Sequence, residues 1–117
     1  MEKAITIFDI LEMKVVGLII VEELELGYIK DKIIVYGTNE IKQAIFTLLE
    51  SFEQKSINTH NLNKKLSALP KGIENLYNIH FLESFPLKSK NKNKSSRYNR
   101  VLEHMNLSHL KRFEYNV

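Results

Sequence analysis

Three side chains near the carboxyl end of the chain are spaced for chemistry on a phosphate group. Arg97, Arg100 and His104 are separated by three, four and seven positions, so on an α-helix they share one face over about two turns. A guanidinium group can hold a phosphate through two hydrogen bonds, and an imidazole titrates near neutral pH. This pattern predicts a site that handles RNA phosphate; the alternative is a solvated basic face that carries no chemistry.

A separate stripe of apolar residues would dock the same helix on a core. These residues repeat at helical spacing about a quarter turn from the basic row. They are Tyr98, Val101, Leu102 and Met105. Ser95 or Ser96 can cap the start of the helix. We therefore expect the basic row to face outward or into a cleft.

The segment before this helix is rich in lysine. Residues 87–96 alternate lysines with polar residues and have no apolar periodicity, which predicts a flexible basic loop. Lys92 and Lys94 are candidate RNA contacts in this loop. The alternative is a solvated loop that binds nothing.

The net charge of +3 conceals two segments of opposite sign. Residues 1–85 carry nine Lys or Arg against twelve Asp or Glu, and residues 86–117 carry eight against two. The first segment is therefore net −3 and the second net +6. A basic tail on an acidic body can attract a polyanion, another copy of the chain or an acidic partner.

Composition narrows the class of protein further. The chain has 117 residues, 44% of them hydrophobic, which fits one compact domain over residues 1–117. It has no cysteine, so disulfides, thiolate zinc sites and cysteine nucleophiles are excluded, and a cytoplasmic location is expected. The four histidines lack metal-ligand spacing and the four glycines form no phosphate loop, so we predict neither a metal nor a cofactor. We also expect no secretory signal, and the apolar run 13–21 is too short to cross a membrane.

The amino-terminal segment has two interpretations. Residues 2–25 place apolar side chains on successive helical turns before Gly27, which predicts a long helix. However, Ile, Val and Tyr dominate residues 14–21 and 28–36, a composition that suits two strands of a hairpin. We expect the helix, and the hairpin is the alternative.

Two helices are predicted in the middle of the chain. Residues 39–54 carry an apolar stripe at helical spacing, with Thr38 or Asn39 as the cap. This helix should pack against the first one. Residues 59–69 begin at a capping threonine and end before Pro70, which predicts a shorter helix with its leucines inward.

A further helix is predicted for residues 73–85, closed by Pro86. With the basic helix at the carboxyl end, the elements predict an all-α fold, a small antiparallel helical bundle of four to five helices. The alternative is an α+β fold with an amino-terminal β-hairpin at about residues 14–36.

Several short motifs follow one another along the chain. A Gly-Tyr-acidic stretch at residues 27–31 leads into the helix at 40–49, and a Thr-His-Asn-Leu turn follows at 59–62. Arg97-Tyr98 then comes after the basic loop. This order resembles small stand-alone members of the HEPN family, the higher eukaryote and prokaryote nucleotide-binding domain.

The HEPN resemblance implies a helical bundle that works as a homodimer, and it implies metal-independent ribonuclease activity where the family's Arg-His element is intact. Carried over to this chain, His104 would act as general acid or base and Arg97 would stabilise charge on the phosphate. Arg100 would be a second phosphate contact. The setting would be a toxin-antitoxin pair or phage defence, with RNA or a cognate antitoxin as the partner.

A second hypothesis belongs to a different class of protein. A non-catalytic modulator would bind another protein through its acidic body or its basic tail, as an antitoxin partner or a phage- or plasmid-encoded inhibitor does. Growth arrest that depends on His104 would favour the ribonuclease. Purified protein that is inert on RNA would favour the binding protein.

Overall fold

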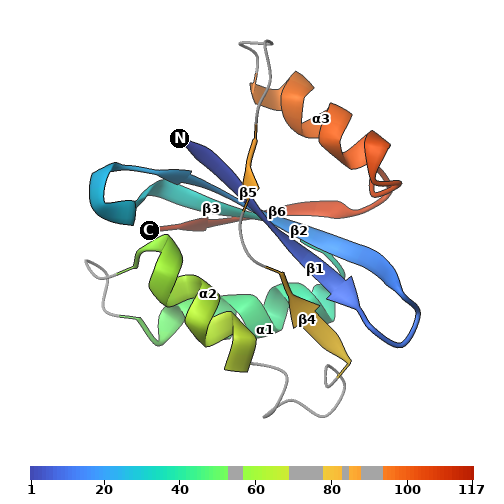
Figure 1. Ribbon diagram of the computed structural model, residues 1–117, viewed down its shortest axis with the longest axis horizontal. Coiled ribbons are helices and arrows are strands. Elements are labelled where there is room, and N and C mark those ends of the chain that lie inside the picture. Colours follow the sequence, from blue (N-terminus) through green and yellow to red (C-terminus); the bar gives the residue numbers. More distant parts are fainter. Residues whose placement is uncertain (53–56, 69–77, 83–84, 88–93) are drawn as a thin grey trace.

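The computed structural model shows an antiparallel sheet with helices on both faces (Figure 1). It describes residues 1–52, 57–68, 78–82, 85–87 and 94–117. The strands lie in the order β4-β1-β2-β3-β6, and β5 also pairs with β1. Their bounds are β1 (Glu2–Asp9), β2 (Lys14–Glu23), β3 (Ile29–Gly37), β4 (Ile79–Phe81), β5 (Phe85–Pro86) and β6 (Lys111–Asn116).

Helices form the two outer layers. One face of the sheet is covered by α1 (Asn39–Glu50) and α2 (Thr59–Ala68), and the other by α3 (Lys94–His104), as Figure 1 shows. A short 3-10 helix, η1 (Glu25–Gly27), joins β2 to β3. An apolar cluster therefore lies on each side of the sheet.

The central strands are buried on both faces, which explains their continuous apolar sequence. On β2, Ile19 and Val21 belong to the cluster under α1 and α2, whereas Leu18 and Ile20 belong to the cluster under α3. The two-residue period of a strand is hidden when both faces are apolar. The long helix predicted for residues 2–25 is therefore wrong, because this segment forms β1, a turn and β2.

The predicted fold class is corrected accordingly. The helix predicted for residues 73–85 is wrong where the structure describes it, because β4 and β5 lie there and pair with β1. The protein is an α+β fold with a large antiparallel sheet, not an all-α bundle of four to five helices. The hairpin alternative for residues 14–36 agrees with the observed pairing of β2 with β3. The helical bundle that the HEPN resemblance implies is likewise not the architecture of the described residues.

The predictions for α1 and α3 are confirmed in their apolar stripes. Thr38 caps α1 as predicted, since its hydroxyl oxygen accepts a hydrogen bond from the N–H of Ile41 at 3.3 Å. In α3, Tyr98 and Leu102 are buried against the sheet. The packing partner of α1 differs from the prediction, because α1 lies on the sheet where a first helix was expected.

Candidate functional site

Arg97, the predicted phosphate-binding residue, is engaged in a buried ion pair. Its guanidinium donates to Oε1 of Glu2 in β1, and the hydroxyl of Tyr98 donates to Oε2 of the same carboxylate. The side chains of Arg97 and Glu2 are only 18% and 10% exposed. The Nε of Arg97 is buried and has no hydrogen-bond partner among the described residues. Arg97 therefore fastens α3 to β1, and the sequence interpretation did not identify Glu2 as its partner.

Tyr98 lies at the centre of this junction. Burial raises the pKa of its hydroxyl well above the usual range, and the hydrogen bond to Glu2 raises that pKa further. The guanidinium carbon of Arg112 in β6 lies 5.9 Å from the centre of the Tyr98 ring. Tyr98 thus stays protonated and serves as a donor that holds the helix on the sheet.

The other residues predicted for the RNA site lie elsewhere. Arg100 and His104 are exposed on α3, and His104 is the last residue of that helix. Lys94 is the first residue of α3, so it belongs to a helix and not to the flexible loop predicted for 87–96. Lys92 lies outside the described residues. The two pockets described next are lined by other residues, so neither brings the predicted catalytic pair together.

A pocket of about 240 Å³ lies on the α3 side of the sheet and is mostly charged. It is lined by Ile20, Glu22, Lys30, Asp31, Lys32, Ile34, Tyr98 and Arg112. Two of its cations pair with one carboxylate, since Glu114 accepts from Arg112 at 2.6 Å and from Lys32 at 3.2 Å. These hydrogen bonds, first that from Arg112, lower the pKa of Glu114. Because Glu114 pairs with both cations, the pocket has no strong excess of charge that would favour an anionic or a cationic ligand. We therefore do not take this pocket as the candidate site.

A larger open pocket, of about 640 Å³, lies between the start of β2 and the connection from α3 to β6. Its walls are apolar and partly or fully buried: Val15, Val16, Met105, Leu107 and Leu110. Its rim is polar and exposed: Glu12, Lys14, Thr38, Asn106 and His109. An apolar centre with a polar rim is the usual anatomy of a protein interface.

A β-bulge shapes the strand side of this pocket. Ile7 of β1 faces Gly17 of β2, but the next residue, Phe8, faces Val15. Val16 is therefore left without a partner on β1. A bulge re-aims side chains and is frequent next to functional sites, and here both Val15 and Val16 line the pocket.

The C-terminal cap of α3 shapes the opposite side. Asn106 has a left-handed φ of +59°, which asparagine tolerates better than most residues. The N–H of Leu107 then donates to the carbonyl of Leu102 at 2.7 Å, and the N–H of Asn106 donates to the carbonyl of Glu103 at 3.1 Å. This pair of bonds is a Schellman cap, which returns Leu107 to the core beside Leu102.

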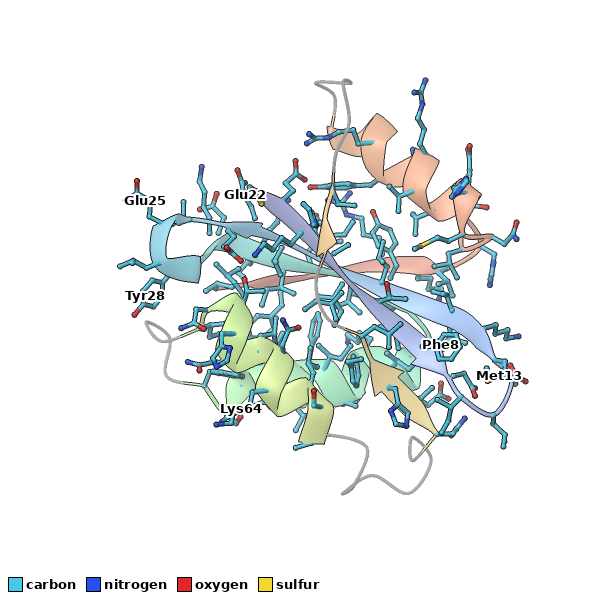
Figure 2. All side chains as sticks on the ribbon, in the orientation of Figure 1. Phe8, Met13, Glu22, Glu25, Tyr28 and Lys64 are labelled. Carbon is cyan, nitrogen blue, oxygen red and sulfur yellow. The ribbon has the colours of Figure 1, made fainter. Side chains whose placement is uncertain are left out.

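Beside the pocket, the turn between β1 and β2 exposes three apolar side chains. Ile10, Leu11 and Met13 are 46%, 72% and 73% exposed, and Figure 2 shows Met13 at the tip of this hairpin. Met13 also has a left-handed φ of 54°, which is uncommon for a bulky residue. Glu12 and Lys14 flank Met13 and line the pocket, so turn and pocket adjoin. We name Leu11, Met13 and the pocket lining together the tip–pocket surface.

Asp9 holds this turn in place. Its Oδ1 accepts hydrogen bonds from the N–H of Leu11 at 2.9 Å, the N–H of Glu12 at 3.0 Å and the side-chain amide of Asn78 at 2.9 Å. The hydrogen bond from Glu12, followed by that from Asn78, lowers the pKa of the Asp9 carboxyl. The exposed apolar side chains therefore lie on an ordered backbone. The sequence signal for this site was a turn of apolar residues directly after an aspartate, which the helical interpretation of residues 2–25 obscured.

The part of the chain that the structure describes holds neither a metal-ion cluster nor a membrane-spanning helix. Within the described residues, no three His, Cys, Asp or Glu side chains gather closely enough to hold a metal ion. In the same part of the chain, no helix has the length and apolar character needed to span a membrane. Comparison of the chain with protein-family models, curated proteins and solved structures found no match. The candidate site therefore rests on its geometry.

Proposed function

We propose that this protein is a non-catalytic binding protein whose partner is another protein. The observation that carries the proposal is the tip–pocket surface, where the exposed Leu11 and Met13 adjoin an open apolar pocket. Contiguous exposed apolar area with a polar rim marks interaction sites on folded proteins. The tip–pocket surface is thus the place where we expect the partner to dock.

The ordered turn supports this proposal through the entropy of binding. Asp9 already fixes the backbone at Leu11 and Glu12 by hydrogen bonds, so little further ordering is needed when a partner docks. Methionine is enriched at protein interfaces, and an anchor on an ordered backbone loses little conformational entropy on docking.

The chemistry of the pocket indicates the chemistry of the partner. Its walls offer dispersion contacts and few hydrogen bonds, so a polar ligand would lose hydration there without compensation. A small apolar molecule would fill the pocket but would leave Leu11 and Met13 exposed. A protein that inserts an apolar side chain into the pocket and rests on the turn would cover both. Met105 suits a pocket wall that receives such a side chain, because its flexible thioether adapts to the shape of a partner.

This proposal does not use the catalytic pair predicted from the sequence. Arg97 is committed to Glu2, whereas His104 is exposed at the end of α3. The HEPN resemblance, the ribonuclease hypothesis and RNA contact by Arg100 stay predictions. RNA that remains intact with the purified protein in the presence of a chelator would support the binding protein, and cleavage abolished by His104→Ala would support the ribonuclease.

Photo-crosslinking followed by binding measurements tests the proposed partner site. A photoreactive side chain at position 13, in cells that express the protein, should capture a protein partner covalently. Position 26 is the matched control, because Leu26 is 91% exposed and has a left-handed φ of 65° but lies in η1, outside the pocket. Figure 2 shows Tyr28, near η1, at the opposite end of the molecule from Met13.

The captured protein is then purified and its affinity measured by calorimetry. Leu11→Ser and Met13→Ser should each weaken binding at least about tenfold, the effect of losing one interface anchor. Leu26→Ser should change the affinity less than about twofold, as surface substitutions away from an interface do. Failure to capture any protein from position 13, or binding that only Leu26→Ser weakens, would overturn the proposal.

A further inference from the structure

The outer edge of β6 is open among the described residues. β6 lies at the end of the strand order and pairs with β3 on its other side. The N–H of Val117 donates to the carbonyl of Asp31 at 2.8 Å, and hydrogen-bonded pairs alternate along an antiparallel ladder. The odd-numbered residues of β6 therefore bond to β3. The backbone N–H and C=O groups of Arg112 and Glu114 point away from β3, outward in the plane of the sheet.

The side chains of these two residues carry opposite charges on one face of the edge. Arg112 and Glu114 lie on the α3 side, 2.6 Å from each other, and are 36% and 42% exposed. Phe113 between them points to the other face, where it packs against the cluster under α1. Over three residues, the edge thus presents two backbone donors, two backbone acceptors, one cationic side chain and one anionic side chain.

We propose that the open edge of β6 pairs with β6 of a second copy of this chain, with Arg112 of each copy opposite Glu114 of the other. A twofold axis through Phe113, perpendicular to the sheet, generates this antiparallel register. Moving the axis to Arg112 or to Glu114 would place identical charges opposite each other, and like charges directly opposite are destabilising. Of these three registers, charge complementarity favours the one centred on Phe113.

This pairing would complete the backbone hydrogen bonding of the edge. The N–H of Arg112 in one copy would donate to the carbonyl of Glu114 in the other, and the N–H of that Glu114 would donate to the carbonyl of Arg112. The twofold axis repeats this pair, so the interface would hold two hydrogen-bonded pairs. Phe113 of each copy would meet at the axis as a cross-strand aromatic pair. Because the paired stretch is short, we expect a dimer that dissociates on dilution. The interface does not include Leu11 or Met13, so this inference does not rest on the proposed function.

Sedimentation velocity of the full chain over a concentration series tests the dimer. Arg112→Glu and Glu114→Arg each place like charges opposite one another, so each should raise the dimer dissociation constant at least about tenfold. Mixed in equal amounts, the two variants should form a heterodimer within about threefold of the wild-type constant. In the heterodimer, every position 112 faces a position 114 of opposite charge.

The mixture separates pairing from misfolding, because a variant that fails to fold cannot restore association in its partner. Lys111→Glu is the matched control: it makes the same charge change on the same strand, but Lys111 has its backbone bonds with β3. It should leave the dissociation constant within about threefold of wild type. A wild-type chain that stays monomeric up to about 1 mM would overturn the inference. So would a mixture that associates no better than its components, or a Lys111→Glu variant as weak as Arg112→Glu.

Discussion

At the scale of single residues, Arg97 shows that the role of a charged side chain depends on the partner it contacts in the fold. Arg97 has the chemistry of a phosphate ligand, but Glu2 and Tyr98 lie against it under α3 and its charge is used inside the fold. In a buried ion pair the cost of desolvation offsets much of the attraction, whereas removal of one partner leaves the other charge buried without compensation. The pair with Glu2 gives Arg97 a structural role, and its role at a phosphate stays a prediction.

We expect Arg97→Ala to lower the free energy of unfolding by about 2 to 4 kcal/mol, because it leaves the Glu2 carboxylate buried and unpaired. Arg100→Ala removes the same side chain from an exposed position of the same helix and should cost no more than about 0.5 kcal/mol. Urea denaturation measures both. Equal effects of the two substitutions would show that the pair with Glu2 does not hold α3 in place.

Asp9 makes the β1–β2 turn sensitive to pH. Its pKa is lowered in the folded protein from the ordinary value of 3.8, chiefly by the N–H of Glu12. The ionised carboxylate therefore stabilises the fold at pH values above 3.8, and this contribution is lost as the pH falls from there through the lower pKa of the folded state. We expect the wild type to be more stable than Asp9→Asn at neutral pH, and the difference to shrink as the pH falls below 3.8. Denaturation at a series of pH values measures it, and a constant difference would contradict this linkage.

Among the elements, β2 needs a residue without a side chain at Gly17, where the backbone of β3 and the side chain of Ile7 in β1 lie very close. A Cβ at Gly17 would lie 2.5 Å from the carbonyl oxygen of Tyr36 and 2.9 Å from Cδ1 of Ile7. Real Cβ atoms do not tolerate such distances, and a backbone oxygen held in the sheet cannot move aside freely. Gly17 therefore permits β2 to lie between β1 and β3 beside the bulge at Val16.

We expect Gly17→Ala to lower the free energy of unfolding by about 1 to 3 kcal/mol, since the added methyl group forces the neighbouring strands apart. Gly37→Ala is the matched control, because a Cβ there would make an ordinary contact of 3.4 Å with the side chain of Ile41. It should change stability by less than about 0.5 kcal/mol. Guanidinium denaturation compares them, and an unchanged Gly17→Ala variant would contradict the strand spacing described above.

On the scale of the whole molecule, the fold redistributes the charge that the sequence concentrates in its tail. Arg97 and Arg112 are neutralised by Glu2 and Glu114, so they contribute less to attraction of a polyanion than the net charge of the tail indicates. Leu11 and Met13 of the tip–pocket surface lie on the β1–β2 turn and are not part of the β6 edge. A dimer through β6 would therefore carry two tip–pocket surfaces and would bind a bivalent partner with higher avidity.

The sequence by itself determined the helices that local signals encode. The apolar stripes of α1 and α3 and the cap at Thr38 follow from residues within a few positions of one another, and the structure confirms them. It also left the β2–β3 hairpin open as an alternative, because Ile and Val suit a strand as well as a buried helix.

Only the tertiary structure decided that residues 2–25 form strands, that Arg97 faces Glu2, and that the β1–β2 turn adjoins the end of α3. A strand buried on both faces shows no alternation, so its period is invisible until the covering layers are known. Glu2 lies 95 positions from Arg97 along the chain. Contacts over such distances are set by how layers pack around a common core, and the spacing of residues in the sequence does not record them.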